Sequence, residues 1–195
     1  MNLRWILLSL ALAACQNATP DNSTSAPPLA GARIGGPFTL IDQDGRTVTD
    51  RSFAGKYRLM YFGYTFCPDV CPTDVAAIAA GLKQVADRSP AQAAKVAPVF
   101  VSVDPERDTP AVLKQFAGAF PIRLTGLTGS TAAIDAVKKA YGVYAARGEA
   151  TPGGGYMVDH SRQAYLMDPD NRPIALVPQD KGPDAVAATI EQWVK

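Results

Sequence analysis

The sequence predicts one α/β domain, built on a central mixed sheet that is flanked by helices and preceded by an N-terminal β-hairpin. Segments with strand character alternate with segments in which apolar residues recur every three or four positions, and a second hairpin and a closing helix follow. The run Arg58–Tyr64 leads to Cys67 and Cys71 at the expected start of a helix. A strand that delivers a cysteine pair to a helix N-terminus is typical of a thioredoxin-like fold, which we therefore predict.

The first half of the domain is expected to contain a hairpin, a buried strand and a long helix. Residues 38–49 are predicted to pair across a turn at Asp44-Gly45, and the apolar, aromatic run that follows suits a strand buried on both faces. Pro72 suits the first turn of a helix, which Thr73-Asp74 would cap or charge. Apolar residues then fall on one helical face at Val75, Ile78, Ala79, Leu82, Val85 and Ala86.

The second half adds further strands and helices without any internal repeat. Asp108 or Thr109 is expected to cap a helix that has Pro110 at its first position. The glycine-rich stretch Gly148–Gly155 is predicted to be a loop. The predicted strands are Val99–Val103, Ile122–Leu124, Tyr156–Ser161, Gln163–Met167 and Ile174–Val177, and the predicted helices are Pro110–Ala117, Thr131–Tyr141 and Pro183–Lys195.

Composition excludes several functional classes. The chain has 195 residues with 47% hydrophobic and 19% charged residues, as expected for one globular domain with a proper core. The formal net charge is +1 and the basic residues are scattered, so we expect no nucleic-acid partner. Three cysteines are too few for a small fold held together by disulfides, so each can be considered singly.

The N-terminus resembles an export signal. Arg4 precedes an apolar run that is too short to span a bilayer and ends in Leu12-Ala13-Ala14-Cys15, which resembles a bacterial lipobox. We predict a lipoprotein signal peptide over residues 1–15, with lipidation of Cys15; an ordinary secretory signal cut near Ala14 is the alternative. Residues 16–34 are predicted to be a disordered tether, and residues 35–195 the domain. Both alternatives export the domain into an oxidising compartment.

Cys67 and Cys71 allow three interpretations. Free backbone N–H groups and the positive end of the helix dipole favour thiolates, which serve both as metal ligands and as nucleophiles, so the pair suits a metal site or a redox pair. The prolines at 68 and 72 disfavour a regular helix over residues 67–71, so a turn is expected to bring the sulfurs together. An inert disulfide or two buried thiols is the third interpretation, which a proline-rich, exposed turn disfavours.

His160 is the single histidine of the chain and follows the glycine-rich loop. A surface histidine would be the plain interpretation. Together with Cys67 and Cys71, however, it would form a soft three-ligand set that suits copper, especially Cu(I), while zinc could use the same ligands with a fourth. The neighbouring Asp159 is either a solvated charge at a strand end or a group that orients and tunes the histidine.

Three stretches of the sequence resemble the Sco/SenC copper proteins that take part in cytochrome c oxidase assembly: YFGYTFCPDVCPTD at 61–74, VSVDPERDTP at 101–110 and YMVDHS at 156–161. The resemblance covers most of residues 35–195. It implies one copper ion, as Cu(I) or Cu(II), bound by Cys67, Cys71 and His160 in a membrane-attached domain that faces the periplasm. It also implies the copper-site subunit of the oxidase, or another periplasmic copper protein, as the partner. The second stretch is assigned no chemistry.

Two functions remain open at this point. The first is a copper chaperone, held by its lipid on the periplasmic side of a bacterial membrane, that loads the binuclear copper site of the oxidase. The second is a thiol–disulfide oxidoreductase that reduces the cysteines of that site through Cys67 and Cys71. The C-x-x-x-C spacing and the lack of a proline at the start of the strand 156–160 disfavour a general oxidoreductase. The residues before either cysteine do not fit a peroxiredoxin.

Overall fold

The computed structural model describes residues 26–150 and 154–195. A seven-stranded mixed sheet has the strand order β2-β1-β5-β4-β3-β8-β9, and β6 and β7 form a separate two-stranded sheet. The strands are β1 Thr39–Asp42, β2 Thr47–Thr49, β3 Tyr57–Gly63, β4 Val96–Ser102, β5 Thr125–Thr128, β6 Ala145–Ala150, β7 Tyr156–His160, β8 Ala164–Met167 and β9 Pro173–Val177. The helices are α1 Val70–Arg88, α2 Pro90–Ala93, α3 Pro110–Gly118, α4 Thr131–Tyr141 and α5 Pro183–Trp193, with short 3-10 turns η1 Asp50–Phe53 and η2 Gln179–Lys181.

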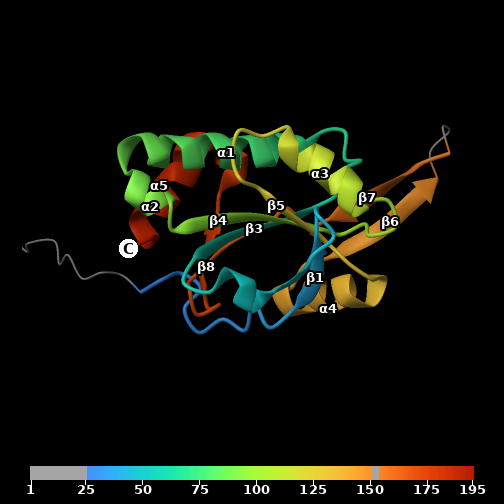
Figure 1. The fold of residues 1–195 in the computed structure, drawn as a ribbon, viewed down its shortest axis with the longest axis horizontal. Helices are drawn as coiled ribbons and strands as arrows, with labels where there is room; N and C mark the ends of the chain where they lie inside the picture. Colours follow the sequence, from blue (N-terminus) through green and yellow to red (C-terminus); the bar gives the residue numbers. More distant parts are fainter. Residues whose placement is uncertain (1–25, 151–153) are drawn as a thin grey trace, which may run out of the picture.

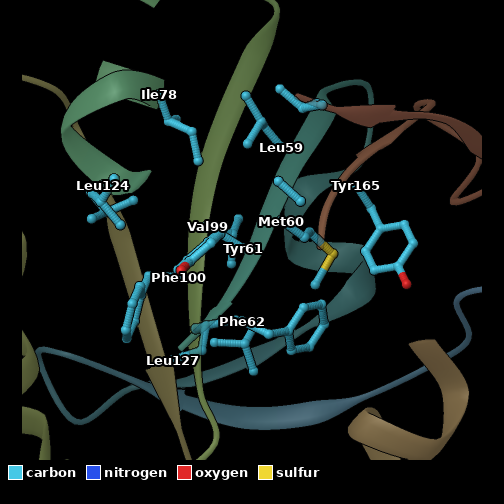
Figure 2. Packing of buried hydrophobic residues seen from close by; sticks show 14 of the residues in the cluster. Leu59, Met60, Tyr61, Phe62, Ile78, Val99, Phe100, Leu124, Leu127 and Tyr165 are labelled. Atoms are coloured by element: carbon cyan, nitrogen blue, oxygen red, sulfur yellow. The ribbon is translucent and has the colours of Figure 1, made fainter. Parts of the chain in front are cut away.

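Helices cover both faces of the sheet, as predicted. Helices α1, α3 and α5 lie on one face and α4 lies on the other (Figure 1). Strand β3 pairs in parallel with β4 and antiparallel with β8, so it lies in the interior of the sheet and is apolar on both sides. Met60 and Phe62 of this strand are fully buried in the core shown in Figure 2.

The close packing of α1 on α5 depends on a glycine in the middle of α1. A Cβ atom at Gly81 would lie 2.7 Å from Cβ of Val186 and 2.8 Å from the carbonyl oxygen of Pro183. Only a residue without a side chain lets the two helices approach this closely. This packing holds α1, and with it the residues of its first turn, against the rest of the domain.

Several predicted elements are confirmed. The N-terminal hairpin forms with Leu40 opposite Val48, and α4 begins and ends where the periodicity placed it. The cap of α3 is Thr109, whose hydroxyl accepts a hydrogen bond from the backbone N–H of Val112 at 3.4 Å. Pro110 occupies the first turn of that helix, where its missing N–H costs no hydrogen bond.

The start of α1 confirms the prediction for Pro72, which lies in the first turn, and contradicts the one for Thr73-Asp74. The helix begins at Val70, so Pro72 lies inside its first turn, where backbone N–H groups have no partner within the helix anyway. Asp69 is the N-cap residue and uses no side-chain hydrogen bond. Thr73-Asp74 therefore does not cap the helix: the Thr73 hydroxyl donates to the carbonyl of Asp69, and the Asp74 side chain is buried.

One predicted strand and one predicted loop are wrong in position. The strand expected at Ile122–Leu124 lies at Thr125–Thr128 instead. A Cβ atom at Gly126 would lie 3.2 Å from Cβ of Leu113, so the glycine lets this strand pack closely against α3. Part of the predicted loop Gly148–Gly155 belongs to β6. Its glycine does not favour a strand, but pairing with β7 supplies backbone hydrogen bonds that keep this part of the chain extended.

The folded domain also begins earlier than predicted. The backbone N–H of Leu29 donates to the carbonyl of Ile174 at 3.0 Å, and Leu29 and Ile34 pack against the core. Residues 26–34, which the sequence predicts to lie in the tether, are thus part of the domain because Leu29 and Ile34 are half-buried against its core. The predicted signal peptide, Cys15 and the remainder of the tether lie outside the described residues.

Candidate metal centre

The structure brings Cys67, Cys71 and His160 together, although 89 positions separate the second cysteine from the histidine. One ligand atom from each residue lies within 4.8 Å of the others. Sγ of Cys71 and Nε2 of His160 are 3.2 Å apart. Cys67 comes from the loop between β3 and α1, Cys71 from the first turn of α1, and the histidine from the end of β7. The three residues that the sequence singled out as ligands thus form one cluster.

A short loop between β3 and α1 places the two sulfurs. The backbone N–H of Cys67 donates to the carbonyl of Tyr64, and α1 begins three residues after Cys67, at Val70. The backbone N–H of Cys71, in the first turn of α1, then donates to Sγ of Cys67 at 3.4 Å. The sequence analysis expected an exposed turn, yet Cys67 is 7% exposed and Cys71 is fully buried. The sulfurs are not joined by a disulfide.

The two thiols have opposite electrostatic environments. Burial would raise the pKa of Cys67, but the backbone N–H groups of Asp69, Cys71 and Val70 hold this pKa below its ordinary value. Burial, together with the neighbouring Cys67 sulfur, raises the pKa of Cys71 to about 12. The thiolate predicted at the helix start is therefore favoured at Cys67 only. A cation between the sulfurs would supply the positive charge that a second thiolate needs.

His160 presents one defined nitrogen to the thiols. Its Nδ1 donates to the carbonyl of Ser161 at 2.9 Å, which leaves Nε2 free as a ligand toward Cys71. Burial lowers the pKa of His160, and the neutral ring is the form that binds metal. The orienting group is thus a backbone carbonyl rather than Asp159, whose side chain is exposed. The negative charge of Asp159 acts on the ring only through space.

Tyr64 and Met157 complete the wall of the site on its solvent side. The ring of Tyr64 meets that of His160 edge to face, with centroids 5.7 Å apart. The Tyr64 hydroxyl donates to Sδ of Met157 at 3.9 Å and accepts from the backbone N–H of Val158 at 3.3 Å. These residues line a shallow surface depression of about 270 Å³ that also contains Cys67 and His160. The Cys67 thiol is therefore buried but adjacent to solvent, whereas Cys71 lies behind it.

An ion pair missed by the sequence analysis joins the two halves of the site. The buried carboxylate of Asp74 accepts from the Tyr61 hydroxyl at 2.8 Å and from Nη2 of Arg162 at 2.7 Å. Asp74 follows Cys71 by three positions on α1, while Arg162 follows His160 by two. The position of Asp74, three residues after a cysteine on the same helix face, was a signal that could have revealed it.

The donor set fits copper. Two sulfurs and one imidazole nitrogen are soft and borderline ligands, a combination that suits Cu(I). Both sulfurs are free, and the nitrogen that faces them carries no hydrogen when Nδ1 donates to Ser161. Copper would be bound here as cargo and would be reached through the depression beside Cys67.

Comparison with known proteins identifies the family. A family model for SCO1/SenC matches residues 26–195. The chain belongs to the SCO1/SenC family. Protein SenC of Rhodobacter capsulatus is 44% identical over 179 residues, which cover 91% of this chain and 75% of SenC. The chain spans about half the length of the mitochondrial SCO1 relatives that it matches.

Solved structures of Sco proteins share the fold. ScoI of Bradyrhizobium japonicum with copper bound is 44% identical, with a TM-score of 0.74 over 82% of this chain and 99% of ScoI. BsSco, described as having a disulfide switch and as a member of the Sco family of cytochrome c oxidase assembly proteins, is 26% identical. Its TM-score is 0.61 over 84% of this chain and 96% of BsSco.

The thioredoxin-like fold is also confirmed. The thioredoxin domain of a thiol-disulfide oxidoreductase from Bacteroides vulgatus, 18% identical, aligns with a TM-score of 0.58 over 83% of this chain and 96% of that domain. At this identity the likeness concerns the fold alone. Within residues 26–150 and 154–195, no helix is both long and apolar enough to cross a membrane.

Proposed function

We propose that this Sco/SenC protein is a copper chaperone that binds one copper ion through Cys67, Cys71 and His160. The observation that carries the proposal is the convergence of two sulfurs and an unprotonated ring nitrogen within 4.8 Å. The copper-bound state of ScoI, a 44% identical family member, supports copper as the metal. Asp159 would contribute only its negative charge, which favours a bound cation.

Delivery to cytochrome c oxidase is the second part of the proposal. The recipient is the copper-site subunit of the oxidase, as the description of BsSco as an oxidase assembly protein supports. The depression beside Cys67 gives a recipient thiol access to a bound ion while the domain stays folded. A three-coordinate ion accepts an incoming sulfur before it loses one of its own, so transfer needs no free copper.

The ligand assignment is tested with His160→Ala. We expect the reduced variant to bind Cu(I) at least about tenfold more weakly than the parent in competition with a chromogenic Cu(I) chelator, because changes outside the ligand shell alone cost as much. X-ray absorption of the parent should show two sulfur ligands and one nitrogen, with the nitrogen lost in the variant. Thiol titration controls for intact cysteines. An unchanged affinity would show that His160 is not a ligand.

Delivery is tested by mixing the copper-loaded protein with the reduced, metal-free copper domain of an oxidase subunit. Copper is expected to move to that domain when the two are in contact, and not when a dialysis membrane separates them. Equal transfer across the membrane would mean passive release and would contradict the chaperone role.

A thiol–disulfide oxidoreductase is the second candidate, favoured by the low pKa of Cys67 beside a surface depression. The Cys67 thiolate would attack a partner disulfide, which forms a mixed disulfide and releases one partner thiolate. Cys71 would then lose its proton and attack Sγ of Cys67, which releases the second partner thiolate and forms the Cys67–Cys71 disulfide. The partner gains two electrons from the two cysteines and two protons, one balanced by the proton that Cys71 loses and one taken from water. Thiol release from the oxidised recipient domain measures this reaction, and a Cys71→Ser variant should stop at the mixed disulfide. Absence of any release excludes it.

We further propose that the domain is tethered by a lipid on Cys15 to the periplasmic side of a bacterial membrane. The support is the lipobox-like sequence that ends at Cys15. The full chain should fractionate with membranes, and Cys15→Ser should release it into the soluble fraction or leave the signal uncut. Retention of a fully processed Cys15→Ser variant in the membrane would contradict lipid anchoring.

A further inference from the structure

The strand that carries His160 belongs to a ribbon outside the main sheet. Among residues 26–150 and 154–195, strand β7 pairs with β6 alone, and this β6–β7 ribbon extends away from the domain (Figure 1). No backbone hydrogen-bond ladder therefore fixes β7 relative to β3, which leads to the cysteines. The backbone ties the ribbon to β3 only beyond His160, where β8 pairs with β3 from Ala164 onward, so side-chain contacts hold the part of β7 before His160.

Arg107 makes two of these contacts, both at Tyr156 on the ribbon. Its Nη1 donates to the carbonyl of Tyr156 at 2.9 Å, and its guanidinium carbon lies 3.6 Å from the centre of the Tyr156 ring. Asp104 accepts from Nε of Arg107 at 2.5 Å and from the Tyr156 hydroxyl at 2.7 Å. The side chain of Arg107 is only 20% exposed, so these contacts are largely shielded from water.

The same guanidinium also covers the loop that leads to Cys67. It lies 4.9 Å from the ring centre of Phe66 and 5.6 Å from that of Tyr64. Tyr64 in turn accepts from the N–H of Val158 on the ribbon. Arg107 therefore contacts both halves of the candidate metal centre, the loop before the cysteines and the strand before the histidine.

The segment that carries Arg107 is itself anchored to the cysteine loop. Asp108 is fully buried, and its carboxylate accepts from the backbone N–H of Thr65 at 3.1 Å and from the hydroxyls of Thr65 and Ser102 at 2.6 Å each. These bonds hold the backbone on one side of Arg107 to the loop two residues before Cys67. Arg107 thus has a fixed base from which it can hold the ribbon.

We propose that Arg107 is a positioning residue that keeps His160 at ligand distance from Cys67 and Cys71 by holding Tyr156. With the contact in place, the site offers three protein ligands; without it, the ribbon moves and the site offers two thiols. This inference rests on the proposed copper binding, and it assigns a role to the stretch VSVDPERDTP. Arg107 acts through His160 and does not touch the metal.

A double-mutant cycle with Arg107→Met and His160→Ala tests this role. In the parent background, Arg107→Met should weaken Cu(I) binding about tenfold, the usual effect of losing an outer contact that orients a ligand. In the His160→Ala background it should change the affinity less than about twofold, because the group it positions is gone. X-ray absorption of Arg107→Met loaded with Cu(I) should show a reduced nitrogen contribution beside two sulfurs.

A matched control and a second variant keep the test decisive. Arg88→Met removes an arginine that pairs with Glu191 far from the site, and it should leave Cu(I) binding unchanged. Tyr156→Leu removes the same contact from the ribbon side. It should show the pattern expected for Arg107→Met, and it replaces that variant in the cycle if Arg107→Met does not fold. If His160→Ala binds Cu(I) like the parent, the ligand assignment fails. The positioning role is overturned if His160→Ala weakens Cu(I) binding but Arg107→Met and Tyr156→Leu do not. It is also overturned if Arg107→Met and Tyr156→Leu weaken Cu(I) binding equally with and without His160.

Discussion

Asp74 provides the most direct test of how the site is held together, through the variant Asp74→Ala. The carboxylate is 1% exposed and accepts hydrogen bonds from Tyr61 and Arg162. Its removal leaves the buried Tyr61 hydroxyl without its acceptor, at a cost of about 1–3 kcal/mol. The pair with Arg162, whose side chain is 44% exposed, adds about 0–1 kcal/mol because water screens it. We therefore expect a loss of about 1–4 kcal/mol in the free energy of unfolding.

The double variant with Tyr61→Phe identifies the cause. Tyr61→Phe alone should lower the free energy of unfolding by about 1 kcal/mol, because the Asp74 carboxylate still accepts the hydrogen bond from Arg162. Combined with Asp74→Ala it removes the orphaned hydroxyl, so the loss should be smaller than the sum of the single losses by about 1–2 kcal/mol. Urea unfolding of the reduced, metal-free proteins, followed by circular dichroism, measures all three values.

Asp87→Ala serves as the control for Asp74→Ala. It removes a carboxylate of the same helix, but one whose side chain is 62% exposed and pairs with Lys83, and it should cost less than about 0.5 kcal/mol. Losses that add within about 0.5 kcal/mol would refute the argument, because they would show that Tyr61 and Asp74 do not depend on each other.

Two further predictions concern the thiols and the histidine. A Cβ atom at Gly63 would lie 3.1 Å from Sγ of Cys71, so Gly63→Ala should weaken Cu(I) binding and cost about 1–3 kcal/mol of stability. Gly118→Ala, with no atom within 4 Å, should do neither. Burial lowers the pKa of His160, so the neutral ring contributes stability that is complete above about pH 6.5 and declines as the pH falls through the lowered pKa. The urea midpoint of the metal-free protein should thus fall more between about pH 7.5 and about pH 5 than that of His160→Gln; equal falls would contradict this.

The sequence by itself determined the candidate ligands and most of the local structure. Cys67, Cys71 and His160 are residue types with distinctive metal chemistry, and they stand out in a chain with three cysteines and one histidine. The N-terminal hairpin and α4 follow from turn residues and periodicity, which act within a few positions. The position of β5 was predicted wrongly because Gly126 does not favour a strand by itself. Its place in β5 is explained by the close packing of α3 against it.

Only the tertiary structure decided how the ligands meet and how each is tuned. His160 reaches Cys71 because a ribbon outside the main sheet brings β7 beside the start of α1, and no local pattern encodes that distance. The difference between the two thiols arises from unequal burial and from N–H groups that converge on Cys67. Arg107 contacts Tyr156, 49 positions away, and the rings of Phe66 and Tyr64, so a side chain to which the sequence assigns no chemistry lies against both halves of the candidate metal centre in space.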